Sequence, residues 1–144
     1  MSDISPPDTH AELLRRPLFA HLATVRPSGA PQSNVMWFDW DGSVLRFTHT
    51  KDRQKFVNLS KDPRVAVSIA DPDDPYRFLE VRGSVESIDD DDEAASFYLS
   101  LQERYGKPHT IPPNHGRVVI SVRPSRFVAW DSGRLVVSGW AAPR

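Results

Sequence analysis

The sequence lacks several residue types and patterns that would point to common kinds of protein. It has 144 residues and no cysteine. Disulfide bonds, thiolate catalysis and cysteine metal sites are therefore excluded. No apolar run approaches the roughly 18 residues that a membrane-spanning helix requires. The first residues, Met1 to Asp8, are polar and contain prolines, unlike a signal peptide. We therefore expect a cytoplasmic protein that does not bind membranes.

An excess of charge of one sign is also lacking. The chain has 18 Lys and Arg against 19 Asp and Glu residues, which gives a net charge of -1. Such a chain has no general affinity for nucleic acid or for anionic membranes, so any anion site must be local. Hydrophobic residues make up 39% of the sequence, as is usual for a soluble globular protein. From the length we expect a single domain over residues 1–144.

The motifs of frequent catalytic and metal sites are missing as well. There is no Gly-x-Ser-x-Gly elbow, and the five histidines have no metal-binding spacing. No Gly-x-Gly-x-x-Gly follows the first expected strand, which argues against a dinucleotide-binding fold. The acidic run Asp89 to Glu93 lacks the alternating ligands and central glycine of a calcium loop. We expect it to open a helix instead, because a helix N-terminus favours acidic side chains.

What the sequence does contain is a series of short strands joined by turns. Gly29, between two prolines, is typical of a turn, and Asp41-Gly42 predicts a type I′ hairpin with positive φ at both central residues. Gly83, inside a long alternating strand, predicts a bulge or a close approach of two backbones. We expect strands over 21–25, 32–40, 43–50, 64–70, 78–88, 117–122 and 127–130, and helices over 8–16, 51–61 and 89–105. We expect residues 135–140 to form either a last edge segment or part of an irregular tail over 131–144.

This order of elements predicts the fold class. Hairpin-linked strands with helices inserted at two points favour an antiparallel sheet over a parallel one. We therefore expect a mainly β protein with helices, of the α+β class. Its centre would be an antiparallel split β-barrel of about six or seven strands, accompanied by about three short helices.

The most informative segment is the junction between the strand over 43–50 and the helix over 51–61. Three side chains that form hydrogen bonds end the strand, and three cationic side chains open the helix. They are Thr48, His49, Thr50, Lys51, Arg53 and Lys55. Because a helix N-terminus presents free N–H groups and a positive dipole end, this junction suits a phosphate. The same pattern also fits a solvated basic helix face, and His49 also fits a half-buried strand histidine.

The strand over 32–40 has two faces of mixed character. Gln32, Asn34, Met36 and Phe38 share one side, and Ser33, Val35, Trp37 and Asp39 share the other. One side suits the core, and the other suits a wall against a flat heteroaromatic ligand. For any single aromatic residue here, packing in the core or in a dimer is the preferred explanation.

Further motifs follow one another in a fixed order from His10 to Trp130. They are Ala23-Thr-Val25, Gly29-Ala-Pro-Gln32, Trp37-Phe38, Asp41-Gly42, Phe47-Thr48, Lys55, Asn58-Leu59, Asp62-Pro-Arg-Val65, Pro75 to Gly83, Arg104-Tyr105 and Arg117 to Pro124. This ordered set resembles the pyridoxamine 5′-phosphate oxidase-like, flavin-reductase-like split β-barrel superfamily. Within it, the set is most similar to the branch that uses the deazaflavin coenzyme F420.

The resemblance implies a homodimer with two cofactor sites at its interface, each holding F420 or, alternatively, FMN. The cofactor phosphate would lie at the junction described above, paired with Lys55 and with Arg53 as a second cation. The strand from Gln32 to Met36 would follow the ring system, and Tyr76 and Arg77 would reach the site from the partner subunit. The implied cofactor-binding residues are Gln32, Asn34, Val35, Met36, Thr48, His49, Thr50, Lys51, Arg53, Lys55, Tyr76 and Arg77.

The resemblance also implies an activity, the transfer of a hydride between F420 and an electron-poor small molecule. Alternatives that stay open are an FMN-binding reductase or oxidase of the same fold and a non-catalytic carrier of F420 or a tetrapyrrole. Hydride transfer depends on the placement of two carbons and the exclusion of water, so a missing catalytic triad is expected. No catalytic residue is assigned, although His49 and Tyr76 are candidate proton donors.

Overall fold

The computed structural model describes residues 4–111 and 115–137, which form eight strands and three helices. The elements are α1 (Glu12–Arg15), β1 (Ala20–Val25), β2 (Pro31–Met36), β3 (Asp39–Trp40), β4 (Leu45–Thr50), α2 (Gln54–Lys61), β5 (Arg64–Asp71), β6 (Asp74–Asp90), α3 (Ser96–Arg104), β7 (Arg117–Asp131) and β8 (Arg134–Val137). The strands join one antiparallel sheet in the order β2-β1-β5-β6-β7-β4-β3, with β8 paired to β7. The expected α+β class and antiparallel arrangement are confirmed.

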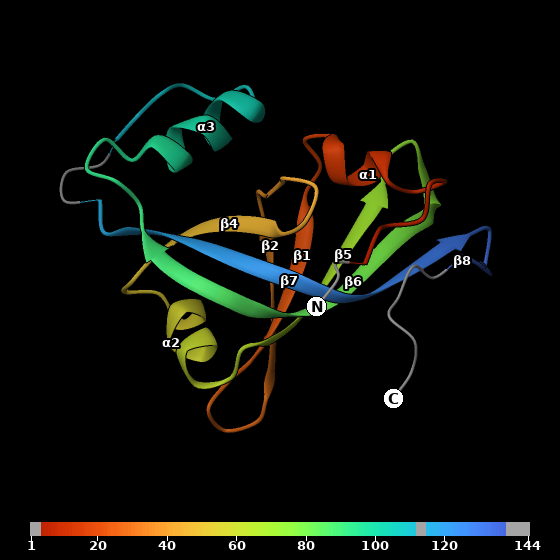
Figure 1. Ribbon diagram of the computed structural model, residues 1–144, viewed down its shortest axis with the longest axis horizontal. Coiled ribbons are helices and arrows are strands. Elements are labelled where there is room, and N and C mark those ends of the chain that lie inside the picture. The colour runs from red at the N-terminus through yellow and green to blue at the C-terminus, as the bar shows by residue number, and fades with distance from the viewer. Residues whose placement is uncertain (1–3, 112–114, 138–144) are drawn as a thin grey trace.

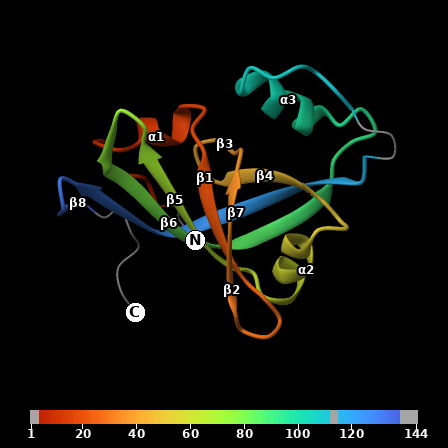
Figure 2. The same ribbon diagram turned by 180° about the vertical axis from the view of Figure 1, so that it is seen from behind.

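The sheet curves round on itself without closing. β1 and β2 cross in front of β4 and β7 in Figure 2, so the two ends of the sheet lie across from each other. At one end β2 pairs only with β1, and at the other Thr48 to Thr50 of β4 pair only with β7. Within the described residues no backbone ladder joins β2 to β4. This opening is called the split below.

The core lies inside the curved sheet. Because successive strand residues point to opposite faces, alternate apolar residues of each strand are buried. Leu13 and Leu14 of α1 cover one end of this core and are fully buried. The strand residues of the core include Leu22, Leu45, Phe47, Val67, Ile69, Leu79, Val81, Ile120, Val122 and Phe127. Each such side chain stabilises the fold by roughly 1.5–3 kcal/mol, so the sheet is a firm frame for the split.

Two helices flank the same end of β4, with α3 above it and α2 below it in Figure 1. The C-terminal end of α3 is tied to the chain that follows α1. Arg104 donates to the carbonyl oxygen of Arg16 at 2.8 Å and to that of Phe38 at 2.9 Å. The neighbouring Tyr105 hydroxyl donates to the carbonyl oxygen of Leu18 at 2.6 Å. No helix of the described ranges is long and apolar enough to cross a bilayer.

Two strand predictions were wrong in their limits. The strand expected over 32–40 breaks into β2 and β3, because Phe38 turns into the core and its N–H donates to the Tyr105 hydroxyl at 3.1 Å. The strands expected over 117–122 and 127–130 are one strand, β7. Pro124 does not interrupt it because it lies opposite Gly83, where the register between β6 and β7 shifts.

The helices begin later than expected. Lys51 to Arg53 form a turn, with the Arg53 N–H bonded to the Thr50 carbonyl at 3.2 Å, so α2 starts at Gln54. The acidic run belongs to the end of β6 and a following loop, and α3 starts at Ser96. The Asp91 carboxylate accepts from two N–H groups at the start of α3, at 3.0 and 3.2 Å. The acidic residues therefore cap the helix from outside it. The helix expected over 8–16 is regular only from Glu12 to Arg15.

Turn and tail predictions were partly right. Gly42 has a φ of +101°, but Asp41 does not have positive φ, so the type I′ assignment was wrong. Instead the Asp41 carboxylate accepts from the N–H groups of Ser43 and Val44, both at 2.8 Å. Arg134–Val137 forms the last edge strand β8, paired with β7. The rest of the predicted tail, residues 138–144, lies outside the described residues.

Gly83 is required by a close approach of two backbones, as predicted. A Cβ atom at this position would lie 2.3 Å from the carbonyl oxygen of Arg123 on β7. We expect Gly83→Ala to lower the free energy of unfolding by roughly 1–3 kcal/mol, because the clash involves backbone on both sides. Ser84→Ala, at the next and exposed position, should change it by less than about 0.5 kcal/mol. Urea unfolding of both variants measures this, and equal stabilities would contradict the crowding argument.

Candidate functional site

A pocket of about 280 Å³ lies in the split and is open to solvent. The end of β2 and Trp37 form one wall. β4, the start of β7 and α3 form the other. The lining residues are Val35, Met36, Trp37, Thr48, His49, Tyr98 and Arg117. The pocket exists because β2 and β4 face each other without pairing.

Lys55 lies in the first turn of α2 and is only 4% exposed. No carboxylate among the described residues forms an ion pair with its ammonium group. Burial lowers the pKa of Lys55, and the nearby positive charge of Arg53 lowers it further. A buried cation without a counter-ion is costly, and here a second cation adds to the cost. The position therefore favours an anion that the described chain does not supply.

The start of α2 adds to this positive charge. α2 has no side-chain cap at its N-cap residue Arg53 and no acidic residue in its first turn. Its first N–H groups are therefore free to bind an external acceptor, and the positive end of the helix dipole lies beside Lys55. An uncapped helix start next to an unpaired buried lysine is the arrangement that binds phosphate.

His49 connects this cationic region to the pocket. Its half-buried ring lines the pocket. Burial lowers the pKa of His49 to about 4, and the charges of Lys55, Arg53 and Arg117 contribute to the decrease. His49 is therefore neutral at pH 7. Such a ring donates or accepts one hydrogen bond at each nitrogen, but it does not hold an anion by charge.

Two buried polar atoms of the pocket residues have no hydrogen-bond partner within the described part of the chain. They are Oγ1 of Thr48 and Nε of Arg117. The guanidinium carbon of Arg117 lies over the ring of Tyr98, 3.8 Å from the ring centre. Buried polar atoms are rarely left unpaired without a functional reason, so Thr48 and Arg117 are pocket residues that retain hydrogen-bonding capacity for a ligand. In the described ranges no group of His, Asp and Glu side chains is arranged to hold a metal ion.

Asn58 fixes α2 against the other wall of the split. Its amide nitrogen donates to Thr24 Oγ1 at 3.0 Å and to Gln32 Oε1 at 3.2 Å, and its side chain is fully buried. Gln32 in turn donates to Asn34 Oδ1 at 2.9 Å. This chain of hydrogen bonds runs from α2 through β1 to β2. It holds the cationic helix start at a constant position relative to the β2 wall.

The structure brings together several of the residues predicted from sequence. Val35, Met36, Thr48 and His49 line the pocket, and Lys55 and Arg53 act electrostatically on His49. Two others are engaged elsewhere. The Lys51 ammonium forms an ion pair with Asp90 at 2.6 Å, and the Thr50 hydroxyl donates to Asp52 at 2.5 Å. Within one chain these two side chains are less available to a ligand than Lys55.

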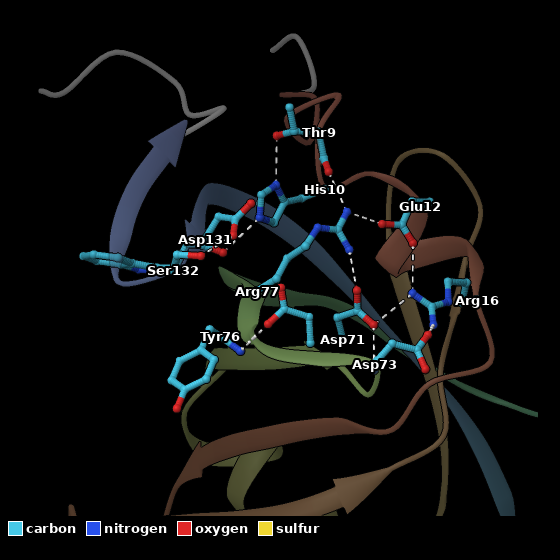
Figure 3. Close-up of polar contacts among 12 residues, drawn as sticks. Thr9, His10, Glu12, Arg16, Asp71, Asp73, Tyr76, Arg77, Asp131 and Ser132 are labelled. Atoms are coloured by element: carbon cyan, nitrogen blue, oxygen red, sulfur yellow. Dashed lines mark hydrogen bonds and ion pairs between the residues drawn. The ribbon is translucent and has the colours of Figure 1, made fainter.

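Tyr76 and Arg77 do not line the pocket of their own chain. Figure 3 shows the Arg77 guanidinium among acidic side chains that join α1 to the turn between β5 and β6. Arg77 donates to Asp71 at 2.9 Å and also to Glu12, so its charge is already balanced. Tyr76 is 72% exposed and points away from this cluster (Figure 3). A role for either residue at a cofactor therefore requires a second subunit.

The sequence-based prediction missed Trp37, Tyr98, Arg117 and Asn58. For Asn58 a signal existed, because it lies three residues after Lys55 and so shares its helix face. No such signal joined Tyr98 and Arg117, which belong to separate elements. Their stacking arises only when α3 folds over the start of β7.

Comparison with known proteins agrees with this geometry. The sequence profile of the family described as pyridoxamine 5′-phosphate oxidase matches residues 6–131. The chain belongs to the pyridoxamine 5′-phosphate oxidase family. Membership in this family supports an oxidoreductase. No protein with a curated description matches the sequence.

Solved structures share the fold of this family member. A structure named F420 reductase is 57% identical, with a TM-score of 0.80 over 84% of this chain and 97% of that one. A conserved hypothetical protein from Mycobacterium tuberculosis is 27% identical, with a TM-score of 0.70 over 92% and 89% of the two chains. HupZ from Group A Streptococcus is 19% identical, with a TM-score of 0.66 over 91% and 98%, and shares the fold alone.

The low pKa of His49 predicts a pH-dependent stability. In the unfolded chain this histidine has its usual pKa near 6.5, whereas in the fold it is about 4. Between these values the unfolded chain binds a proton that the folded chain does not, so this contribution is present above pH 6.5 and is lost toward pH 4. We expect His49→Gln to show a smaller loss of unfolding free energy than the parent protein between pH 7 and pH 5. Urea unfolding at the two pH values measures it, and equal losses would contradict the burial of the neutral ring.

Proposed function

We propose that this protein is an F420-dependent oxidoreductase that transfers a hydride between the deazaflavin coenzyme and an electron-poor small molecule. The observation that carries the proposal is Lys55, a buried cation at an uncapped helix start that has no anionic partner among residues 4–111 and 115–137. Membership in the pyridoxamine 5′-phosphate oxidase family and the 57% identical structure named F420 reductase support the same reaction class.

The phosphate of the coenzyme would bind at the start of α2. Lys55 supplies a charge-assisted hydrogen bond, Arg53 a second cation, and the first turn of α2 its free N–H groups. The buried Thr48 hydroxyl, which has no partner in the described chain, would contact the arm between phosphate and ring. An anion bound here would also offset the repulsion between Lys55 and Arg53.

The ring system would lie against β2, as the resemblance implies. The edge of β2 that faces the split has no strand partner in the described residues, so its backbone N–H and C=O groups are free to pair with a polar ring edge. Val35 and Met36 supply apolar contact along the same strand. When bound, F420 supplies the hydride. The protein orients the ring and excludes water from one side of it.

A homodimer is part of the proposal. Val35 and Tyr76 are large side chains that are 58% and 72% exposed in one chain. A partner chain that covers β2 would bury Val35 and bring its own Tyr76 toward the split. The second subunit would thereby complete a pocket that is open to solvent in the single chain.

Removal of the Lys55 charge should affect binding and stability in opposite directions. We expect Lys55→Met to weaken F420 binding by roughly 1.5–3 kcal/mol, the usual contribution of a hydrogen bond to a charged group, which is about 10- to 150-fold in Kd. The same change should raise the unfolding free energy of the apoprotein, because it removes an uncompensated buried charge. Lys61→Met, at the exposed end of α2, is the matched control and should alter neither quantity appreciably.

Fluorescence titration of the apoprotein with F420 and, separately, with FMN tests the cofactor assignment. Tighter binding of F420 together with hydride transfer to an added acceptor supports the proposal. Tighter binding of FMN indicates the flavin-dependent alternative, and tight F420 binding without turnover of any acceptor indicates a carrier. An unchanged Kd for F420 in Lys55→Met would show that the phosphate does not bind at α2.

The oligomeric state gives an independent prediction. We expect the protein to elute with a mass of twice the 16.3 kDa chain in light-scattering chromatography, because the proposed site requires residues of a second subunit. Binding of one F420 per chain by a stable monomer would contradict the interfacial site while leaving the role of Lys55 intact.

A further inference from the structure

The wall of the pocket opposite β2 contains a polar group that the proposed function does not use. We propose that Arg117, whose guanidinium lies over the ring of Tyr98, binds the carbonyl oxygen of the hydride acceptor and thereby selects planar conjugated carbonyl compounds as substrates. This inference rests on the proposed function, because it assumes that the coenzyme ring occupies the β2 side of the split.

Contacts within the described chain hold the Arg117 side chain in place but leave it hydrogen-bonding capacity for a ligand. Its guanidinium carbon lies over the Tyr98 ring, 3.8 Å from the ring centre, and its buried Nε has no hydrogen-bond partner among the described residues. Its structural hydrogen bonds come from the backbone instead. The Arg117 N–H donates to His115 at 3.0 Å, and its carbonyl oxygen accepts from the Asp91 N–H at 2.9 Å. A change of the side chain therefore leaves these bonds in place.

The position of Arg117 distinguishes it from the cations that would hold the coenzyme. Lys55 and Arg53 belong to the start of α2 and do not line the pocket, whereas Arg117 belongs to β7 and lines it. A flat ring against Val35 and Met36 would leave Arg117 and Tyr98 on the facing wall. A second planar molecule between the ring and Tyr98 would then have its oxygen within reach of the guanidinium.

The remaining surface of the pocket explains why an uncharged conjugated compound fits better than a second phosphate. Val35, Met36, Trp37 and the ring of Tyr98 supply apolar and aromatic contact, which a planar molecule covers. His49 is neutral at pH 7 and lies on the same wall as Arg117, so it adds no charge. Arg117 is thus the cationic side chain among the residues that line the pocket.

During the reaction Arg117 would stabilise the negative charge that develops on the acceptor's carbonyl oxygen. A hydride from the reduced deazaflavin forms a C–H bond at the far carbon of a C=C–C=O unit. The π electrons of that C=C bond move to form a new C=C bond to the carbonyl carbon, and the C=O electron pair moves onto oxygen. The resulting enolate takes a proton from water at its α-carbon, and the coenzyme leaves oxidised. A guanidinium N–H placed at the oxygen stabilises the charge that develops there.

Three variants test this assignment, with cyclohex-2-en-1-one as acceptor and reduced F420 as donor. Arg117→Met keeps an apolar contact with Tyr98 and removes the charge, so we expect kcat/KM for the enone to fall at least tenfold. The Kd for F420 should change less than twofold. Arg117→Lys keeps the charge without the planar fork and should recover part of the loss. Arg82→Met removes an exposed arginine of β6 that pairs with Glu80, and should change neither value.

A second readout does not depend on turnover. Acetophenone carries a conjugated carbonyl oxygen on a flat ring but no C=C–C=O unit outside the ring. NMR titration of the protein loaded with oxidised F420 should show weaker acetophenone binding, by threefold or more, in Arg117→Met than in Arg82→Met. If Arg117→Met does not fold, Arg117→Lys supplies the same comparison, with a smaller expected loss.

The outcomes separate this inference from the proposed function. Normal enone reduction and normal acetophenone binding by Arg117→Met would overturn the role of Arg117 and leave the F420-dependent activity standing. A parent protein that binds no F420, or that reduces no acceptor, would overturn the proposed function and this inference with it. A loss of F420 binding in Arg117→Met that equals the loss of activity would assign Arg117 to the coenzyme and overturn its role in acceptor binding.

Discussion

An unpaired buried charge is the feature on which the rest of the site depends. Lys55 is almost completely buried, has no ion pair in the described chain and lies next to a second cation. The folded chain tolerates this only because the sheet and its core are stable enough to hold α2 in place. Asn58 provides the local attachment through its hydrogen bonds to β1 and β2. Part of the folding free energy therefore keeps these cationic groups buried and close together, at a cost in stability, until an anion binds.

The split in the sheet provides space for a ligand close to this charge. If β2 and β4 were paired, the barrel would close and no space would remain beside His49. Because the sheet stays open there, the edges of β2 and β4 that lack a strand partner in the described residues border a common pocket. Thr48 and Arg117, whose Oγ1 and Nε have no hydrogen-bond partner in the described chain, line this pocket. Helix α3 supplies the last wall. At its C-terminal end, Arg104 and Tyr105 donate hydrogen bonds to carbonyl oxygens that follow α1, and this attachment keeps Tyr98 over Arg117. The architecture therefore places a flat ligand between strands, with its anionic end at a helix start.

The sequence allowed much of the fold to be predicted, and the errors have physical causes. Alternating apolar residues identified nearly every strand, because burial on one face imposes a period of two. The predicted strand limits were wrong where tertiary contacts outweighed the local sequence pattern. Phe38 ends β2 early by turning into the core, and Pro124 stays inside β7 because it lies at a shift in register. The acidic loop caps α3 from outside, which local composition does not distinguish from a helix start.

By itself, the sequence determined the antiparallel α+β class, the family, and the concentration of cations after β4. These follow from periodicity, turn residues and motif order, which are properties of neighbouring residues. Tertiary structure alone decided which of those cations is buried and which is paired, because burial and pairing depend on distant segments. Lys51 meets Asp90 from the end of β6, whereas Lys55 meets no acid in the described chain. The stacking of Arg117 on Tyr98 was likewise decided by the packing of α3, since no local pattern relates two residues on separate elements.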